Sequence, residues 1–304
     1  MRDTFKAMTF PAVLIVFLLF ASMLFVYFTN AIPAFHRFGI DVYLKNVWRA
    51  SEEPIRELYG VAAAIWGSVY TSLIAIALAL PLSISYSVFV VDYAPKWLKN
   101  PLIIISDIMA GLPTIIYGLW GALVLVPFLR EHLMEPLHEH LSFIPLFSYP
   151  PTTGYSYFSA GVLLAIMVTP FASAVIREAY SMVPFTYREA VYALGATRFE
   201  ATKLLIGYIR PAIVSGTILA FGRAIGETVA VSLVIGNTFN MTWQLFAPGY
   251  TVSSLIANQF GNAFIYEYMT PVLYAAGLAL FLIGLVVNLL GLRILRRWEE
   301  NVKF

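Results

Sequence analysis

The sequence has no cysteine and few charged residues, and each of these features excludes some classes of protein. Without cysteine there are no disulfides, no thiolate nucleophile and no Cys-ligated metal. Only 12% of the 304 residues are Asp, Glu, Lys or Arg, whereas a soluble domain carries about 25%. So little charge cannot cover a globule in water, which excludes a large soluble core and predicts an integral membrane protein.

Two further absences limit the function. The formal net charge is only +2, and no basic patch interleaved with aromatic residues is present, so nothing predicts a nucleic-acid partner. The phosphate-binding loop pattern G-x-x-x-x-G-K-[ST] is also missing. A chain of this kind would borrow ATP hydrolysis from another subunit, but the same absence fits a channel or a secondary carrier equally well.

Long apolar runs are what the sequence has instead. A spanning helix needs about 20 apolar residues. The second and third runs are longer than one crossing and contain Pro81 and Gly111-Leu112-Pro113, so we expect a kink or break in each. The sequence predicts six transmembrane helices, over residues 10–31, 62–91, 102–129, 157–176, 213–235 and 271–292.

Six crossings put both termini on one side of the membrane. That side would hold most of the 19 lysines and arginines, among them Arg2, Lys6 and Lys303, so the positive-inside rule predicts that both termini are cytoplasmic. The first run has no clear cleavage site, which favours a retained helix over a signal peptide. We expect three parts: a first helix with an outer loop in 1–58, a main helical domain in 59–298 and a cytoplasmic tail in 299–304.

The two outer loops differ in character. Residues 32–60 form a mixed-charge loop long enough for a short helix. Residues 130–156 contain a His/Glu cluster, which is one way to bind a metal. A solvated loop near the membrane surface is the favoured interpretation, and we assign no metal. The cluster consists of His132, His138 and His140 with Glu131, Glu135 and Glu139.

Three ionisable residues lie at apparent membrane depth: Asp107, Arg223 and Glu227. A charge there costs at least about 2.5–3.5 kcal/mol, and such residues usually face the bundle interior and mark a pathway. Arg223 and Glu227 are four residues apart, so on one helix they would share a face and pair. Asp107 precedes the expected break and has the weaker claim to a pathway.

Gly222 and Gly226 have the same spacing of four as the charged pair. A G-x-x-x-G ridge lets another helix approach closely. Two hypotheses then stay open: an internal salt bridge beside a tight helix contact, or an oxyanion site at Arg223, whose planar fork matches phosphate-like groups. In the second, Glu227 would hold the guanidinium in place.

The longest inner loop lies between the fourth and fifth runs. Thr186 and Glu189 fit a capping box, Gly195 interrupts the apolar periodicity, and the pattern predicts a short helix, a glycine turn and a second helix near residues 186–205. Such a helix either docks into a partner's groove or lies among the lipid headgroups. The residues alone do not choose between these.

The stretch from Glu189 and Ala190 to Gly195 resembles the EAA-x-x-x-G motif of ABC importer permeases, although Val191 replaces the second alanine and Pro211 lies later than the motif's usual proline. In that family the motif is the coupling helix that contacts the ATPase. The resemblance implies that Glu189, Ala190 and Gly195 couple this chain to such a subunit.

Three further stretches resemble the C-type permease subunits of phosphate-specific ABC importers. They are the segment from Tyr59-Gly60 to Ser72, AGLPTIIYGLWGALVLVP at 110–127 and GRAIGETVAVSLVIGNT at 222–238. The resemblance runs from about Tyr59 to Arg297. It implies an all-α, type I importer fold in the cell membrane of a prokaryote, and a role for Arg223 and Glu227 in phosphate passage.

The resemblance also implies the partners. These are an A-type permease forming a heterodimer, two cytoplasmic ATPase subunits that bind ATP and Mg²⁺, an extracytoplasmic phosphate-binding protein, inorganic phosphate and membrane lipid. The chain itself would bind no cofactor and catalyse nothing. Rival hypotheses are a permease for sulfate, molybdate or tungstate, an ATP-independent channel or carrier, and a non-transporting membrane scaffold.

Overall fold

The computed structural model describes the backbone of residues 2–302 and the side chains of residues 9–296, and this part of the chain is mostly helical. Short 3-10 and π-helical turns carry the label η. In chain order the elements are α1 (Arg2–Phe38), α2 (Asp41–Leu44), β1 (Trp48–Arg49), η1 (Pro54–Arg56), β2 (Leu58–Tyr59), α3 (Ala62–Val88), η2 (Phe89–Tyr93), α4 (Lys96–Gly111), α5 (Thr114–Trp120), η3 (Gly121–Leu125), α6 (Val126–Leu129), η4 (Arg130–Met134), α7 (Glu135–Leu141), η5 (Pro145–Phe147), α8 (Tyr157–Ser181), α9 (Phe185–Ala193), α10 (Arg198–Tyr208), α11 (Arg210–Gly226), α12 (Val229–Ser232), α13 (Val252–Gln259), η6 (Phe260–Asn262) and α14 (Met269–Val302).

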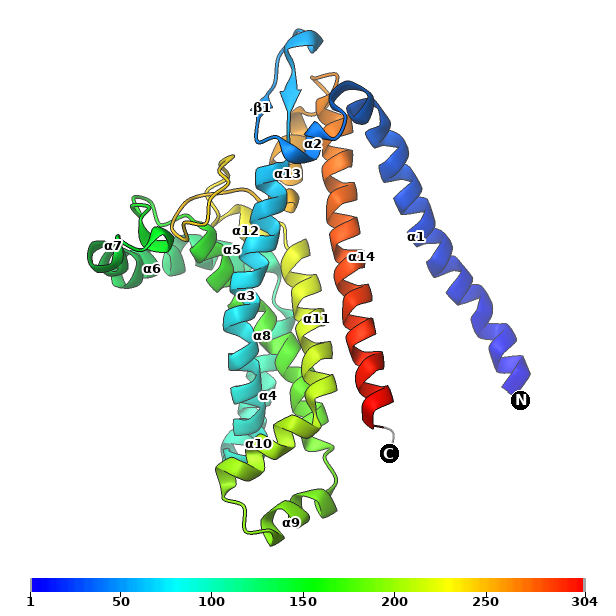
Figure 1. Ribbon diagram of the computed structural model, residues 1–304, viewed down its shortest axis with the longest axis vertical. Coiled ribbons are helices and arrows are strands. Elements are labelled where there is room, and N and C mark those ends of the chain that lie inside the picture. The colour runs from blue at the N-terminus through cyan, green and yellow to red at the C-terminus, as the bar shows by residue number, and fades with distance from the viewer. Residues whose placement is uncertain (1, 303–304) are drawn as a thin grey trace.

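Helices α3, α8 and α11 form the central bundle (Figure 1). Small residues let α3 and α8 approach closely: a Cβ added to Gly161 would lie 2.4 Å from the side chain of Ile74. Hydroxyls reach across the same contact, where Ser87 donates to the carbonyl of Ser173 at 3.0 Å. At this contact a hydroxyl buried in the apolar bundle is therefore satisfied by a neighbouring helix.

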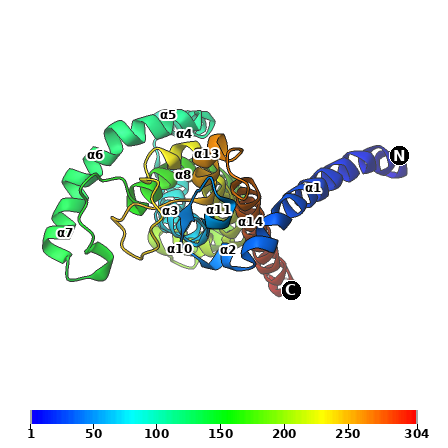
Figure 2. The same cartoon turned by 90° about the horizontal axis from the view of Figure 1, so that it is seen from above.

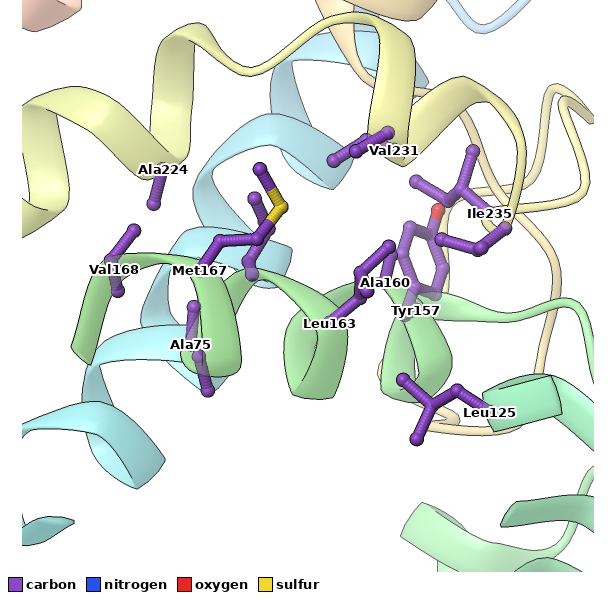
Figure 3. Close-up of a cluster of buried hydrophobic side chains, with 14 of the residues drawn as sticks. Ala75, Leu125, Tyr157, Ala160, Leu163, Met167, Val168, Ala224, Val231 and Ile235 are labelled. Atoms are coloured by element: carbon purple, nitrogen blue, oxygen red, sulfur yellow. The ribbon is translucent and has the colours of Figure 1, made fainter. Parts of the chain in front are cut away.

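The core of the bundle is built by side chains from four helices. Leu163 and Met167 of α8 meet Ala75 of α3, Ala224 of α11 and Val231 of α12, and all five are buried (Figure 3). The apolar, small-residue face of α3 and the larger side chains of α8 thus interlock. This packing fixes where α11 ends, which matters for the site described below.

Helix α14 lies beside α11 of the bundle, and α1 contacts α14 and diverges from it toward the N-terminus (Figure 1). The rings of Tyr27 and Tyr274 lie 5.8 Å apart, and those of Phe20 and Phe281 lie 4.8 Å apart. Gly277 admits the ring of Tyr27, because a Cβ there would come within 2.5 Å of it. From above, α1 projects away from the rest of the molecule (Figure 2), so its apolar surface suits a lipid environment.

The break expected at Gly111-Leu112-Pro113 is confirmed, but the crossing predicted over 102–129 is wrong as a single helix. Helix α4 ends at Gly111, and its 16 residues give about 24 Å, less than the roughly 30 Å of the hydrocarbon core. The helix long and apolar enough to span runs instead over Thr114–Leu141. That run of α5, α6 and α7 curves away from the bundle (Figure 2).

In the described residues, five helices are long and apolar enough to cross a membrane, and a sixth crossing is present if α10 and α11 count as one bent span. The angle between those two helices is 67°. The crossing predicted over 213–235 is therefore wrong beyond Gly226, where α11 ends. The prediction of an all-α membrane protein with six crossings otherwise stands.

The beginning of α1 and the end of α14 point toward the same end of the molecule as α9 and α10 (Figure 1). This arrangement is what an even number of crossings requires. Which side of the membrane that end faces stays a prediction. Of the basic residues behind it, the side chains of Arg2 and Lys6 and the whole of Lys303 lie outside the described residues.

The loop between α1 and α3 contains the expected short helix, α2, together with one element that was not expected. Strands β1 and β2 pair antiparallel, with Trp48 opposite Tyr59. Their aromatic rings pack into a core that also includes residues of α1, α13 and α14. The hairpin thus ties the end of α1 and the beginning of α14 to the start of α3.

Candidate functional site

Helix α11 ends at Gly226, one residue before Glu227, and this corrects the shared helix face predicted for the charged pair. Glu227 has φ −69° and ψ 129°, an extended conformation. Its carboxylate turns toward α12 and accepts a hydrogen bond from the amide of Ala230 at 3.4 Å. No ion pair between Arg223 and Glu227 forms within the described part of the chain.

Arg223 has an aromatic partner in place of the expected carboxylate. Its guanidinium carbon lies 4.3 Å from the centre of the Phe171 ring on α8, a cation–π contact. Its Nε is buried and has no hydrogen-bond partner among the described residues. An unpaired donor in such surroundings is costly. The face of the guanidinium is thus occupied by a ring, and its buried Nε makes no hydrogen bond among the described residues.

Arg223 and Glu227 nonetheless line one cavity of about 470 Å³. Its walls come from three helices that are far apart in the chain, and Asn288 of α14 adds a polar group at its edge. The amide nitrogen of Asn288 donates to the carbonyl of Gly284 at 2.8 Å. The lining residues are Phe171, Ile218, Leu219, Gly222, Arg223, Gly226, Glu227 and Asn288.

Gly222 and Gly226 belong to this cavity and do not pack against another helix of this chain. A Cβ added to either glycine would meet nothing within 4 Å in the described structure. The close helix contact predicted from G-x-x-x-G is therefore absent within the chain. The two glycines instead leave the face of α11 beside Arg223 open.

Asp107 lies apart from the cavity. Its carboxylate is 3.6 Å from Nη2 of Arg177 on α8, and its side chain is 59% exposed. It does not contribute to the walls around Arg223. The three ionisable residues predicted to form one pathway are thus divided between two places.

The inner loop folds as predicted into a short helix, a glycine turn and a second helix. Gly195 has φ +81°, in the left-handed region that favours glycine. A capping box is present, but it lies eleven residues later than predicted. Pro184 is the N-cap residue of α9, so Thr186 lies inside that helix and does not cap it. Thr197 and Glu200 form it instead, and donation by Thr197 holds the pKa of Glu200 below its usual value.

The surface around this turn is apolar and unpartnered in the single chain. Phe185, Leu194 and Phe199 are 72%, 88% and 77% exposed. Leu194 lines a cavity of about 820 Å³ whose walls also include Gly195, Glu200 and Lys203. Exposed apolar side chains at a polar rim are typical of a protein interaction site.

A polar cluster fastens α9 to the ends of two bundle helices. Arg188 pairs with Asp92 of η2 through Nη1 and Oδ1 at 2.8 Å. The hydroxyl of Tyr180 donates to the other carboxylate oxygen of Asp92 at 2.6 Å. Arg188 also donates through Nη2 to the Tyr180 carbonyl at 2.7 Å. The carboxylate and the carbonyl that accept hydrogen bonds from Arg188 thus both belong to this chain.

The outer histidines turn to the backbone. His138 lies with its Nδ1 2.8 Å from the carbonyl of Phe147, and His140 with its Nδ1 2.9 Å from that of Pro136. Among the described residues, no group of three or more His, Cys, Asp or Glu is arranged to hold a metal.

Sequence reasoning missed Phe171, Asn288, Asp92 and the role of Arg188. Phe171 and Asn288 sit in apolar helices where nothing in the sequence indicates which neighbour they face. Asp92 and Arg188 are separated by 96 residues. A charged residue just after a long apolar run was the available signal for Asp92.

Three comparisons place the chain among known proteins. Residues 87–300 match the family described as binding-protein-dependent transport system inner membrane component. The chain is 68% identical over 300 residues to the probable phosphate transport system permease protein PstC of Methanocaldococcus jannaschii, covering 99% of this chain and 95% of that protein. It is 36% identical over 290 residues to the phosphate transport system permease protein PstC of Pasteurella multocida, covering 94% and 89%.

Among solved structures, the fold resembles the MetNI methionine ABC transporter in an inward-facing conformation. The TM-score is 0.58 at 16% identity, over 78% of this chain and 95% of that one. At this identity the likeness concerns the fold alone.

Proposed function

The chain belongs to the family of binding-protein-dependent transport system inner membrane components, and we propose that it is a permease subunit of an ATP-driven importer of inorganic phosphate. The relatives named as phosphate permeases cover nearly the whole chain. In this proposal the subunit forms half of the passage in a prokaryotic cell membrane and catalyses nothing itself. ATP and Mg²⁺ are bound by partner subunits.

The observation that carries the cargo assignment is that Arg223 lines a cavity of about 470 Å³ and has no carboxylate partner among the described residues. Phosphate offers several acceptor oxygens, and an arginine edge binds two of them at once. The ring of Phe171 occupies one face of the guanidinium, and no carboxylate among the described residues pairs with its charge. An anion in the cavity thus meets a fixed positive charge at membrane depth.

Glu227 has a different role in this proposal from the one its spacing suggests. Its side chain is 9% exposed and shares the cavity with Arg223 without pairing to it. A carboxylate in the same cavity repels a bound anion and so limits how tightly phosphate is held. A transported ion has to leave the site, and weak binding favours release. Asp107 has no part in this step, since it pairs with Arg177 elsewhere.

The partners follow from the two open surfaces. The face of α11 at Gly222 and Gly226 is left uncovered by this chain, and an A-type permease subunit closes the cavity there. The apolar surface around Leu194 and Gly195 docks one of two ATPase subunits, with Glu189 and Ala190 on the helix that enters it. A phosphate-binding protein delivers the anion at the opposite end, and ATP-driven closure of the ATPase pair alternates access.

The test is phosphate uptake by the assembled complex carrying Arg223→Ala. The substitution removes the anion contact, so we expect uptake to fall at least about 100-fold, as when a charged partner of a buried ion is deleted. Arg223→Lys keeps the charge but not the fork, and uptake falls less. The measurement is radiolabelled phosphate entry into proteoliposomes containing the whole complex and ATP.

Arg56→Ala is the matched control, because Arg56 forms an exposed ion pair with Glu53 in the outer loop. It leaves uptake unchanged, and the complex with Arg223→Ala still co-purifies with its ATPase. Uptake at the wild-type rate by the Arg223→Ala complex contradicts the proposal. If sulfate or molybdate inhibits uptake of the labelled phosphate as strongly as phosphate itself does, the cargo is another oxyanion.

A further inference from the structure

Helix α9 has little apolar attachment to the rest of the chain. Val191 is its one buried residue, and the side chains around the following turn point outward. Hydrophobic burial of a single valine adds little to the attachment of a whole helix. Something else has to hold α9 if a force applied to it is to reach the membrane helices.

The Asp92, Arg188 and Tyr180 cluster supplies that attachment. Both carboxylate oxygens of Asp92 are used, one by Arg188 and one by the Tyr180 hydroxyl. The guanidinium also lies 5.0 Å from the centre of the Tyr180 ring. Charge-assisted bonds of this length are about twice as strong as neutral ones and are sensitive to direction.

Partial burial separates this ion pair from those on the surface. The side chains of Arg188 and Asp92 are 19% and 23% exposed, whereas Lys45 and Asp41 in the outer loop are 59% and 48% exposed. Water and salt screen the first pair less. Tyr180 itself is fully buried, in a cluster with Val88 of α3 and Leu205 of α10.

The local backbone supports a specialised role. Helix α3 continues into a π-helical turn, Phe89–Tyr93, which includes Asp92 and ends with the amide of Ala94 bonded to the Phe89 carbonyl at 2.7 Å. Such turns are rare and occur frequently at functional sites. The carboxylate of Asp92, within this turn, reaches Arg188 of α9.

We propose that Asp92, Arg188 and Tyr180 form the joint through which movement of α9 reaches α3 and α8 during transport. This inference rests on the proposed docking of an ATPase at α9. When the docked subunits close, α9 is displaced, and Arg188 draws the ends of α3 and α8 with it. Because α8 carries Phe171 as well as Tyr180, the joint connects the docking surface to the helix that holds Arg223.

A double-mutant cycle on the intact complex tests the joint. The variants are Asp92→Asn, Arg188→Gln and the two together, with phosphate uptake and ATP turnover measured on the same proteoliposomes. We expect each single variant to lower phosphate taken up per ATP hydrolysed by about five- to tenfold, and the double variant to lose no more than the worse single one. A loss in the double variant equal to the product of the two single losses overturns the proposal.

Two further measurements separate the joint from a merely structural role. Tyr180→Phe keeps the ring beneath Arg188 but removes the hydroxyl, and it lowers the uptake-to-ATP ratio less than Asp92→Asn does. The ATPase co-purifies in wild-type amount with all variants. If it is lost from Arg188→Gln, the cluster only maintains the docking surface and the proposed joint is wrong.

The same experiment distinguishes this proposal from the proposed function. A wild-type complex that takes up no phosphate contradicts the phosphate assignment. The cycle is then read on ATP turnover stimulated by the cognate binding protein, which needs no assumption about the cargo. Non-additive loss of that stimulation supports the joint even in that case.

Discussion

Arg223 and Arg188 show two opposite uses of the same side chain. Arg188 has a carboxylate, a carbonyl and an aromatic ring around it, all from this chain. Arg223 has an aromatic ring and a buried Nε with no partner in the described structure. An arginine whose donors are satisfied joins elements of the protein, whereas one that lines a cavity without a carboxylate partner is prepared for a ligand.

The largest expected effect beyond the loss of Arg223 itself comes from the ring that orients it. Phe171→Leu keeps an apolar side chain but removes the cation–π contact, worth about 1–2 kcal/mol where water is limited. We expect the apparent KM for phosphate to rise about 5- to 30-fold. Phosphate uptake measured over a range of phosphate concentrations checks this.

Phe171→Tyr is the matched control, because it retains the aromatic face. It should keep the apparent KM close to that of the wild type. Were leucine and tyrosine at this position to behave alike, Phe171 would be ordinary packing and the contrast between the two arginines would lose its basis.

A smaller effect is expected in the turn beside Arg188. Gly195→Ala adds no clash, since a Cβ there meets nothing within 4 Å in the described structure, but it imposes a positive φ of 81° on an L-residue. That conformation costs about 1 kcal/mol, so ATPase binding should weaken about fivefold, measured by titrating the ATPase onto the purified permease pair. Gly284→Ala, in α14 and outside the cavity beside Gly195, has the same free space without the positive φ and should bind normally.

The smallest effect is expected at the ion pair between Arg177 and Asp107. Arg177 is intermediate between Arg188 and Arg223, because some of its donors have a partner and some do not. Its Nη1 is buried without a partner, while Nη2 lies 3.6 Å from the exposed Asp107. A pair with one exposed member contributes about 0–1 kcal/mol, so Asp107→Asn should change phosphate uptake by less than about threefold. A larger loss of phosphate uptake would show that Asp107 belongs to the phosphate pathway, as its position in the sequence predicts.

The long apolar runs and the positions of glycine and proline predicted most of the helical framework. Helices α1, α3, α8 and α14 lie where the apolar runs are, and the break before Pro113 is present. The end of α11 was not predictable in this way. Gly226 is a weak helix former, but glycine is also frequent inside membrane helices, so it did not by itself mark the end of α11. In the structure α12 follows at once and packs into the core through Ala230 and Val231.

The candidate site was predictable in its residue types and not in its contacts. Charge at membrane depth singled out Arg223 and Glu227, and both line the cavity. Spacing then suggested a pair, because a four-residue separation implies contact only while the helix continues. The partner that Arg223 has, Phe171, comes from a different helix, and Asp92 finds Arg188 only once the bundle has folded.

The pairing of α1 with α14 sets a waiting time during synthesis. Tyr43, just after α1, donates to the carbonyl of Ala275 in α14, across 232 residues of chain. At about 5–20 residues per second, roughly 10 to 50 seconds pass between the two. Throughout that interval α1 has to remain in the bilayer without α14. Apolar side chains are exposed along much of its length, so contact with lipid alone can hold α1 in the membrane.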